Sequence, residues 1–398
     1  MSTLIFLLLF CDDLLSILFP VVLLAMVGTE FYDELYSLLR FWWIGLLAAA
    51  ALLVHIGAYA RAPRNGGCMH GLVAVSVATL LGGLGFISRE EYFSPTALYY
   101  SLGLGVVMLL IYLLLRSEAD RPRDYDVAEQ MLRILYAGGL FTGFVVALFY
   151  VRNFHEFAQS FATLYFKYRN FSATMLLISI PAAAYFAAHD PRHFVSVAFM
   201  YLMMLMTGSR SGLLFGSVLL VMCAIYIYIT NKKSRRLYNL LFGCAALLAV
   251  AAAVIVVPEL YAARIENAAA GDKTRIEFIR RGINNFLSHP VLGIGIGSTK
   301  DIEIFKAYVP GSLVFYHNAV IQVISSMGLA GIAAYGWIFI KRLKMLWQGR
   351  KSTGVFAFAL SYIGILMMSM TNPGIFCPFP EVGLLTLMFA MIEKEESI

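Results

Sequence analysis

A histidine and an asparagine stand at the start of a long apolar run, in the segment YHNAVIQVISSMGLAGI (316–332). An imidazole group ordinarily titrates near neutral pH, so His317 is a candidate to remove a proton from a hydroxyl group. Asn318 offers an amide that could orient the base or an acceptor. A helix that enters a membrane needs no histidine, and a polar cap at the interface is the alternative interpretation of both residues.

Three arginines form a second group of candidate residues: Arg169 in KYRNFSA, Arg210 in TGSRSG and Arg275 in KTRIEF. A guanidinium group can bind a phosphate through two parallel hydrogen bonds. Arg210 lies between two apolar runs, where a charge requires a partner, and no acidic residue near it in sequence supplies one. The pattern predicts an anion site, and snorkelling to lipid headgroups is the alternative for each arginine taken alone.

The composition places these residues in a membrane protein. Of the 398 residues 60% are hydrophobic and 14% are charged, and the mean hydropathy is +0.78. One soluble core cannot bury so much apolar surface. The net charge of +6 is spread over short clusters between apolar runs, as the positive-inside rule produces. We therefore expect membrane lipids as the surroundings and no nucleic-acid partner.

Twelve apolar runs could form membrane-spanning helices. They cover residues 3–27, 41–60, 69–87, 95–115, 131–151, 171–188, 194–207, 211–230, 238–257, 317–340, 354–371 and 374–392. We expect an all-α polytopic membrane protein with about 12 transmembrane helices, in a single integral membrane domain over residues 1–398. The segment TGSRSG (207–212) joins runs seven and eight and predicts a tight hairpin.

The distribution of basic residues predicts which loops face which side. NKKSRR (231–236) and KRLKMLWQGRK (341–351) fall on the same side when the spans alternate. The positive-inside rule assigns that side, and both termini, to the cytoplasm. The 207–212 hairpin and the long loop 258–316 then face the periplasm or the cell exterior.

The 258–316 loop is the one sizeable hydrophilic segment of the sequence, and long loops frequently carry function. Part of it, TRIEFIRRGINNFLSHP, repeats apolar residues at helical spacing. These are Ile276, Ile279, Ile283, Phe286 and Leu287. Pro290 follows the predicted helix end. We expect a short amphipathic helix at the membrane surface, with arginines on its polar sides.

Two further motifs resemble cofactor or metal sites only superficially. GIGIGS (293–298) lacks the preceding strand of a dinucleotide-binding loop and is interpreted as a turn. DYD (124–126) has the carboxylate spacing of metal-dependent nucleotide-sugar transferases, but no predicted sheet surrounds it. The five cysteines form neither a zinc pattern nor a disulfide framework. We expect no metal site and no cofactor.

The order of the motifs resembles that of a known family. HNAVIQVISSMGLAG, with His-Asn followed by Gly328-x-x-Gly331, resembles the signature of the bacterial O-antigen ligases and related polysaccharide polymerases. GSRSG resembles the arginine hairpin of that family. TRIEFIRRGINNFLSHPVLGIGIG resembles its periplasmic-loop segment, which closes with Pro-x-x-Gly-x-Gly. The likeness covers roughly residues 165–340, and the first 160 residues match in hydropathy alone.

The resemblance implies a metal-independent, inverting glycosyltransferase in the bacterial inner membrane. Such an enzyme moves a glycan from undecaprenyl diphosphate to a hydroxyl acceptor, a sugar of the lipid A core, at the periplasmic face. His317 would be the base, and Asn318 would orient the base or the acceptor. Arg210, Arg275 and Arg169 would bind the donor diphosphate and stabilise its developing negative charge.

Two other functions remain open at this point. A polymerase that joins repeat units on the same lipid carrier would use the same motifs, although the chain length and the single modest loop favour a ligase. A transporter or flippase would explain many helices and arginines outside the cytoplasm. It would require charges deep within the spans, and Asp12 and Asp13 are nearly the only mid-span charges.

Overall fold

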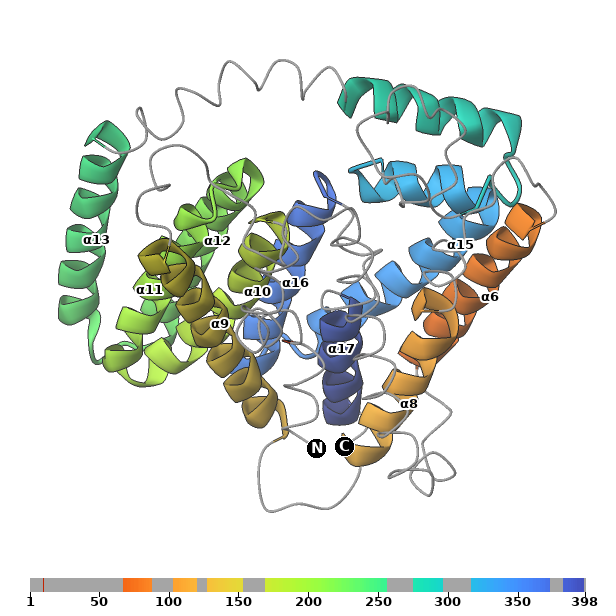
Figure 1. Ribbon diagram of the computed structural model, residues 1–398. Coiled ribbons are helices and arrows are strands. Elements are labelled where there is room, and N and C mark those ends of the chain that lie inside the picture. The colour runs from red at the N-terminus through yellow and green to blue at the C-terminus, as the bar shows by residue number, and fades with distance from the viewer. Residues whose placement is uncertain are drawn as a thin grey trace. The chain divides into compact units, whose positions relative to one another are not determined.

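The computed structural model describes Phe10 and residues 67–87, 103–119, 127–152, 169–255, 275–295, 316–372 and 382–396. These residues are predominantly helical and contain no strand (Figure 1). Four of their helices are long and apolar enough to cross a membrane, namely those at Ala128–Val151, Asn170–His189, Arg210–Thr230 and Ala319–Gln348. The all-α class is confirmed for this part of the chain. Apart from Phe10, the predicted spans at 3–27 and 41–60 lie outside the described residues.

The chain divides into two units, neither of which is continuous in sequence. The first comprises residues 1–54, 125–271 and 352–368. The second comprises residues 55–124, 272–351 and 369–398.

The first unit is a helical bundle built around α10 (Arg169–His189). Its other elements are α9 (Val127–Arg152), the short 3-10 helix η4 (Pro191–His193), α11 (Phe194–Met206), α12 (Arg210–Thr230), α13 (Arg235–Ile255) and α16 (Thr353–Ser369). The turn between α11 and α12 covers residues 207–209, which confirms the predicted hairpin.

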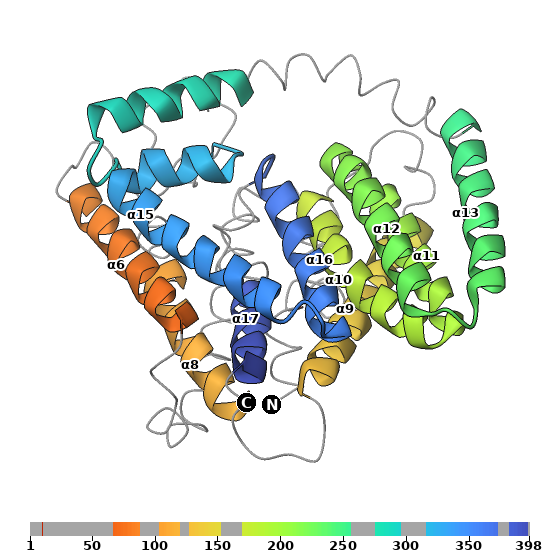
Figure 2. The same cartoon turned by 180° about the vertical axis from the view of Figure 1, so that it is seen from behind.

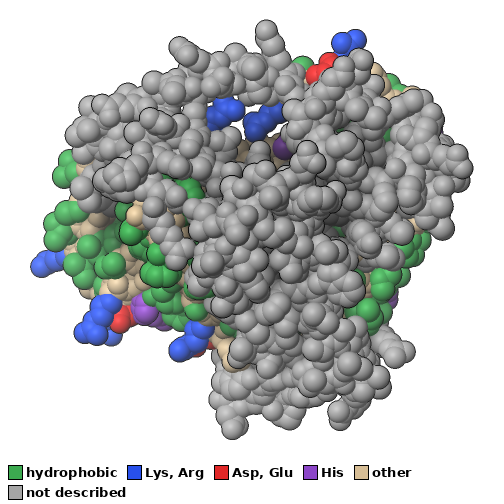
Figure 3. Space-filling model, in the orientation of Figure 1, with side chains coloured by type: hydrophobic (Ala, Val, Ile, Leu, Met, Phe, Trp, Pro, Cys, Tyr) green, Lys and Arg blue, Asp and Glu red, His purple; other side chains and the backbone are tan. Residues whose placement is uncertain are grey.

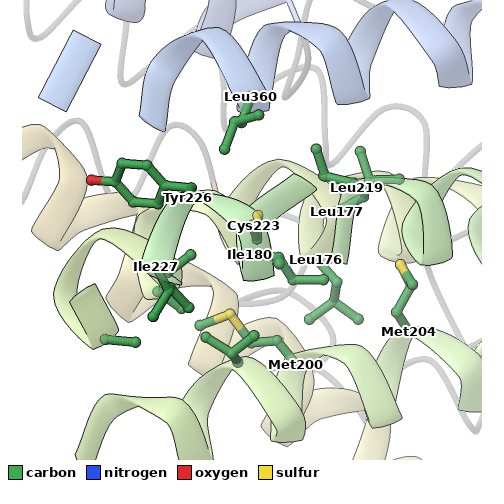
Figure 4. Close-up of a cluster of buried hydrophobic side chains, with 14 of the residues drawn as sticks. Leu176, Leu177, Ile180, Met200, Met204, Leu219, Cys223, Tyr226, Ile227 and Leu360 are labelled. Atoms are coloured by element: carbon green, nitrogen blue, oxygen red, sulfur yellow. The ribbon is translucent and has the colours of Figure 1, made fainter. Parts of the chain in front are cut away.

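The core of the first unit forms where α11, α12 and α16 meet α10 (Figure 4). Leu176, Leu177 and Ile180 of α10 are fully buried there. They meet Met200 and Met204 of α11, Leu219 and Cys223 of α12, and Leu360 of α16. The hydroxyl of Ser361 donates to the carbonyl of Ile178 at 2.7 Å, which ties α16 to α10. Small residues along α10 allow this close approach of helices.

The basic loop and the arginine hairpin lie at opposite ends of this bundle. Asn231, which ends α12, donates through Nδ2 to the carbonyl of Ala188 near the end of α10 at 2.9 Å. The basic segment 231–236 therefore lies at the same end as η4. The 207–209 turn lies at the other end of α12, beside the start of α10. This arrangement agrees with the alternation of sides expected from the sequence.

The second unit contains α6 (Gly67–Ile87), the π-helix η2 (Gly103–Val107), α8 (Met108–Ala119), a helix at residues 275–288, α15 (Ala319–Gln348) and α17 (Gly383–Glu396). Here α15 packs along α6, and α17 packs along α8. The carboxylate of Glu393 in α17 accepts a hydrogen bond from the backbone N–H of Cys68 at 3.0 Å. It thereby satisfies one of the free N–H groups at the start of α6.

Many apolar side chains point outward from both units. On α12 the exposed residues Leu214, Val218, Val221, Ile225 and Ile229 recur at helical spacing along one stripe. Apolar side chains also cover parts of the visible outer surface of the described helices (Figure 3). Contiguous apolar surface of this kind is unfavourable in water and is typical of helices that face lipid.

Candidate active site

Asn318 begins α15 as its N-cap residue. Its Oδ1 atom accepts hydrogen bonds from the backbone N–H groups of Val320 at 3.0 Å and Ile321 at 3.1 Å. Its Nδ2 atom donates to the carbonyl of Met370 at 3.2 Å. The side chain therefore satisfies the free N–H groups of the helix and anchors its start to residue 370. Asn318 is therefore the N-cap of α15, and its position at a membrane interface and its role toward a base or an acceptor stay predictions.

His317 has an unusual backbone conformation. Its φ is +53°, and it is the sole residue other than glycine with a positive φ in the described part of the chain. A β-carbon makes this left-handed conformation unfavourable, and surrounding contacts must maintain it. Such residues are concentrated at functional sites.

The His317 ring is held against the helix at residues 275–288. It stacks on Phe278 with a centroid distance of 5.7 Å and an interplanar angle of 26°. The Nδ1 atom is shielded from solvent and has no hydrogen-bond partner among the described residues. Burial lowers the pKa of His317 below its ordinary value of about 6.5, and the nearby charge of Arg275 lowers it further. The imidazole is therefore neutral at pH 7, which is the form that can accept a proton.

The helix at residues 275–288 lies along the first turns of α15 (Figure 2). Phe278, Tyr316 and Ile321 form a small buried cluster between them. Gly282 is also buried in this contact, and a β-carbon there would collide with the side chain of Ile321. This packing places Arg275 and His317 at the same end of the pair of helices. The structure thus brings together two residues that are 42 positions apart in the sequence.

The predicted amphipathic helix is present, but the face that it buries differs from the predicted apolar stripe. The contact with α15 is made by Phe278 and Gly282, with Asn285 one turn further along. The exposed face carries Ile276, Ile279, Ile283 and Leu287. An apolar stripe that remains exposed is compatible with a helix lying at a membrane surface.

A buried polar network links this helix to α15. The phenol oxygen of Tyr316 accepts hydrogen bonds from Asn285 Nδ2 at 2.7 Å and from Ser325 Oγ at 2.9 Å. The backbone N–H of Tyr316 donates to Gln322 Oε1 at 3.0 Å. Ser325 and Gln322 are fully buried, and Tyr316 nearly so. All three hydrogen bonds are made with Tyr316, which immediately precedes His317.

The α15 helix is interrupted at Gly328, where φ is 59° and ψ is −146°. The segment at 290–295 inserts its backbone at the break. Ile294 and Gly295 donate N–H groups to the carbonyls of Ser325 and Ser326 at 2.9 and 3.0 Å. The N–H groups of Leu329 and Ala330 donate to the carbonyls of Pro290 and Val291 at 2.8 and 3.1 Å. We call these four hydrogen bonds the backbone clamp.

Glycine is required on both sides of the backbone clamp. Gly293 has a φ of +66°, and a β-carbon there would lie 2.4 Å from the backbone nitrogen of Met327. A β-carbon on Gly328 would lie 2.4 Å from the carbonyl oxygen of Pro290. The two glycine motifs noted in the sequence, one in the loop and one in the helix, therefore meet. The turn predicted at GIGIGS begins in this contact, and its residues after 295 lie outside the described part of the chain.

The other two arginines belong to the first unit. Arg169 and Arg210 are the first residues of α10 and α12. The two helix starts are adjacent, because Ser209 Oγ donates to Asn170 Oδ1 at 2.7 Å and also accepts from Gly212 N at 3.1 Å. The Arg210 side chain is exposed and forms no ion pair within the described residues. Two adjacent helix N-termini and an arginine form an environment that favours an anion.

The five predicted site residues therefore form two groups, with Arg169 and Arg210 in one unit and Arg275, His317 and Asn318 in the other. The sequence analysis did not identify Tyr316, Gln322 and Ser325. Gln322 and Ser325 could have been found from the sequence, because polar side chains at positions 322, 325 and 326 of an apolar run share one helical face.

Comparison with known proteins identifies a family that part of the chain resembles. Residues 195–336 match the family model described as O-antigen ligase. No curated protein matches the chain significantly. The matched segment includes Arg210, Arg275, His317 and Asn318, and it contains both halves of the backbone clamp, whereas Arg169 precedes it. The resemblance to the O-antigen ligase and polymerase family is thus confirmed over the segment that contains most of the predicted site.

Proposed function

We propose that this protein is an O-antigen ligase-type glycosyltransferase. It transfers a glycan from undecaprenyl diphosphate to a hydroxyl group of an acceptor, a lipid A core sugar, with inversion and without a metal ion. The principal support is the neutral His317, in a left-handed conformation beside Arg275, inside a segment that matches the O-antigen ligase family.

His317 acts as the general base in this proposal. It accepts the proton of the acceptor hydroxyl while that oxygen forms a bond to the anomeric carbon of the glycan. The bond between this carbon and the diphosphate oxygen breaks on the opposite face, so the configuration inverts. The low pKa of His317 keeps the imidazole neutral and ready to accept the proton at pH 7. Asn318 maintains the start of α15 and so orients the residue before it.

Arg210, Arg275 and Arg169 bind the donor diphosphate in this proposal. The leaving group gains negative charge as the glycosidic bond breaks, and fixed cationic groups stabilise that charge. The adjacent N-termini of α10 and α12 add backbone N–H groups and the positive ends of two helix dipoles. Cationic residues can fill the role that a metal ion has in other transferases.

We further propose that the chain is one integral membrane domain of the bacterial inner membrane, with about twelve transmembrane helices and both termini in the cytoplasm. The 258–316 loop and the 207–212 hairpin then face the periplasm.

Labelling of single cysteines in intact cells tests this topology. A cysteine at Lys300 should react with an impermeant reagent, and a cysteine at Lys232 should not. The opposite pattern would invalidate both the topology and the site.

A polymerase is the second candidate, because the matched family supports both activities equally. The purified protein should be incubated with an undecaprenyl-diphosphate-linked glycan, with and without lipid A core. A ligase yields glycosylated lipid A core and consumes the donor when this acceptor is present. A polymerase lengthens the glycan on the carrier without it. Movement of the donor across vesicles without any transfer would instead support the transporter alternative.

A further inference from the structure

Gln322 is a fully buried amide in the first turns of α15. Its Nε2 atom donates to Ser326 Oγ at 2.9 Å, one turn along the same helix. Its Oε1 atom points the other way and accepts from the backbone N–H of Tyr316 at 3.0 Å. A buried amide is unfavourable unless both ends are paired, and here both ends are. One of the two partners lies outside the helix and directly before His317.

Tyr316 is held by its side chain as well as by its backbone. Its phenol oxygen accepts hydrogen bonds from Asn285 and from Ser325, which belong to two different helices. On the other side of His317, Asn318 is held by its own hydrogen bonds to the start of α15 and to Met370. Tyr316 and Asn318 are therefore both anchored, and His317 is the single residue between them. His317, which connects these two residues, has a φ of +53°.

We infer that Gln322 is a positioning residue for His317, which it orients by fixing the backbone of Tyr316. This inference rests on the proposed function, in which His317 is the base. A general base works when its nitrogen lies within hydrogen-bond distance of the reacting hydroxyl, and small displacements reduce the rate strongly. Gln322 itself contacts no reacting atom in this scheme. It prevents the peptide at 316–317 from relaxing to a conformation that turns the imidazole away from Phe278.

The test compares Gln322→Met with Ser326→Ala in the purified full-length protein. The first change keeps the length of the side chain and removes both hydrogen bonds. The second removes only the partner of Nε2 and leaves the bond to Tyr316. Gln322→Leu is the additional variant if Gln322→Met does not fold, since it also removes the bond to the backbone N–H of Tyr316. Melting temperatures establish which variants are folded.

Two measurements separate positioning from catalysis. Modification of His317 by diethyl pyrocarbonate, followed by mass spectrometry of its peptide, reports whether the imidazole has left its shielded position. Turnover of an undecaprenyl-diphosphate-linked glycan with lipid A core gives kcat and KM. For Gln322→Met we expect modification to become several-fold faster and kcat to fall by about 10- to 100-fold, with KM for the donor within about twofold. Ser326→Ala should resemble the wild type in both measurements.

An unchanged modification rate and an unchanged kcat in folded Gln322→Met would overturn the inference. Equal losses in Gln322→Met and Ser326→Ala would also overturn it, because they would assign the effect to the stability of α15. Faster modification with normal turnover would refute the role of His317 in the proposed function, although Gln322 would still fix the ring. The failure of the inference is thereby distinguished from the failure of the proposed function.

Discussion

Replacement of Gly328 by alanine should open the backbone clamp. The added β-carbon would lie 2.4 Å from the carbonyl oxygen of Pro290. That oxygen cannot simply move away, because it accepts the N–H of Leu329 at 2.8 Å. The φ of 59° and ψ of −146° also lie close to a region that glycine alone adopts readily.

The size of the effect follows from the cost of the backbone conformation and from the hydrogen bonds that are lost. The backbone conformation costs about 1–3 kcal/mol for a residue with a β-carbon. Displacement of the loop also removes the hydrogen bonds that Leu329 and Ala330 donate, each contributing about 1 kcal/mol. The local free energy of opening should therefore fall by about 3–5 kcal/mol, which corresponds to at least a ~150-fold loss of protection from hydrogen exchange.

The assay is hydrogen–deuterium exchange of the purified protein, with the peptide that contains Leu329 and Ala330 as the readout. Gly336→Ala is the matched control, because Gly336 lies in the same helix and a β-carbon there meets no atom within 4 Å. Alanine should stabilise that helical position by about 0.5–1 kcal/mol. Equal protection in the two variants would refute the clamp as the source of local stability.

Three further predictions concern the proposed site. His317→Ala should lower turnover by about 10²–10⁴-fold while donor binding and melting temperature stay near those of the wild type, and normal turnover would return His317 to the role of an interfacial residue. Arg210→Lys should fail nearly as badly as Arg210→Ala, because lysine keeps the charge but loses the two-pronged contact with phosphate. The exposed Arg280 provides the control, since both of its substitutions should be tolerated. In the proposed mechanism activity requires neutral His317, so it falls as the pH drops through the pKa of His317. Arg275→Gln removes a nearby positive charge and should raise this pKa, so the loss of activity should begin at a higher pH. The pKa should still lie below about 6.5, because His317 remains buried.

The helices of the first unit could be predicted closely from hydropathy. The predicted runs at 131–151, 171–188 and 211–230 correspond to α9, α10 and α12. Their long apolar stretches are bounded by polar or turn-forming residues, and both signals are local in sequence. The break in α15 is not local. Residues 290–295 replace the interrupted hydrogen bonds, so neither segment alone indicates the conformation of Gly328.

The site was predictable in its residue types and less so in its geometry. His317 and Arg275 were recognised from their chemistry, and the structure places them together. The residue before His317, Tyr316, is bonded to Gln322, Asn285 and Ser325, which come from two helices. The loop helix buries Phe278 and leaves the predicted apolar stripe exposed. Apolar periodicity alone does not decide which face packs on protein and which faces lipid.

The hydrogen bond from Cys68 to Glu393 has a consequence for biogenesis. Its two residues are 325 positions apart, and they join the first described helix of the chain to the last. During synthesis α6 is translated long before the carboxylate that accepts the N–H of Cys68 in its first turn. The second unit, which contains His317 and Arg275, therefore completes this contact only after α17 has been synthesised.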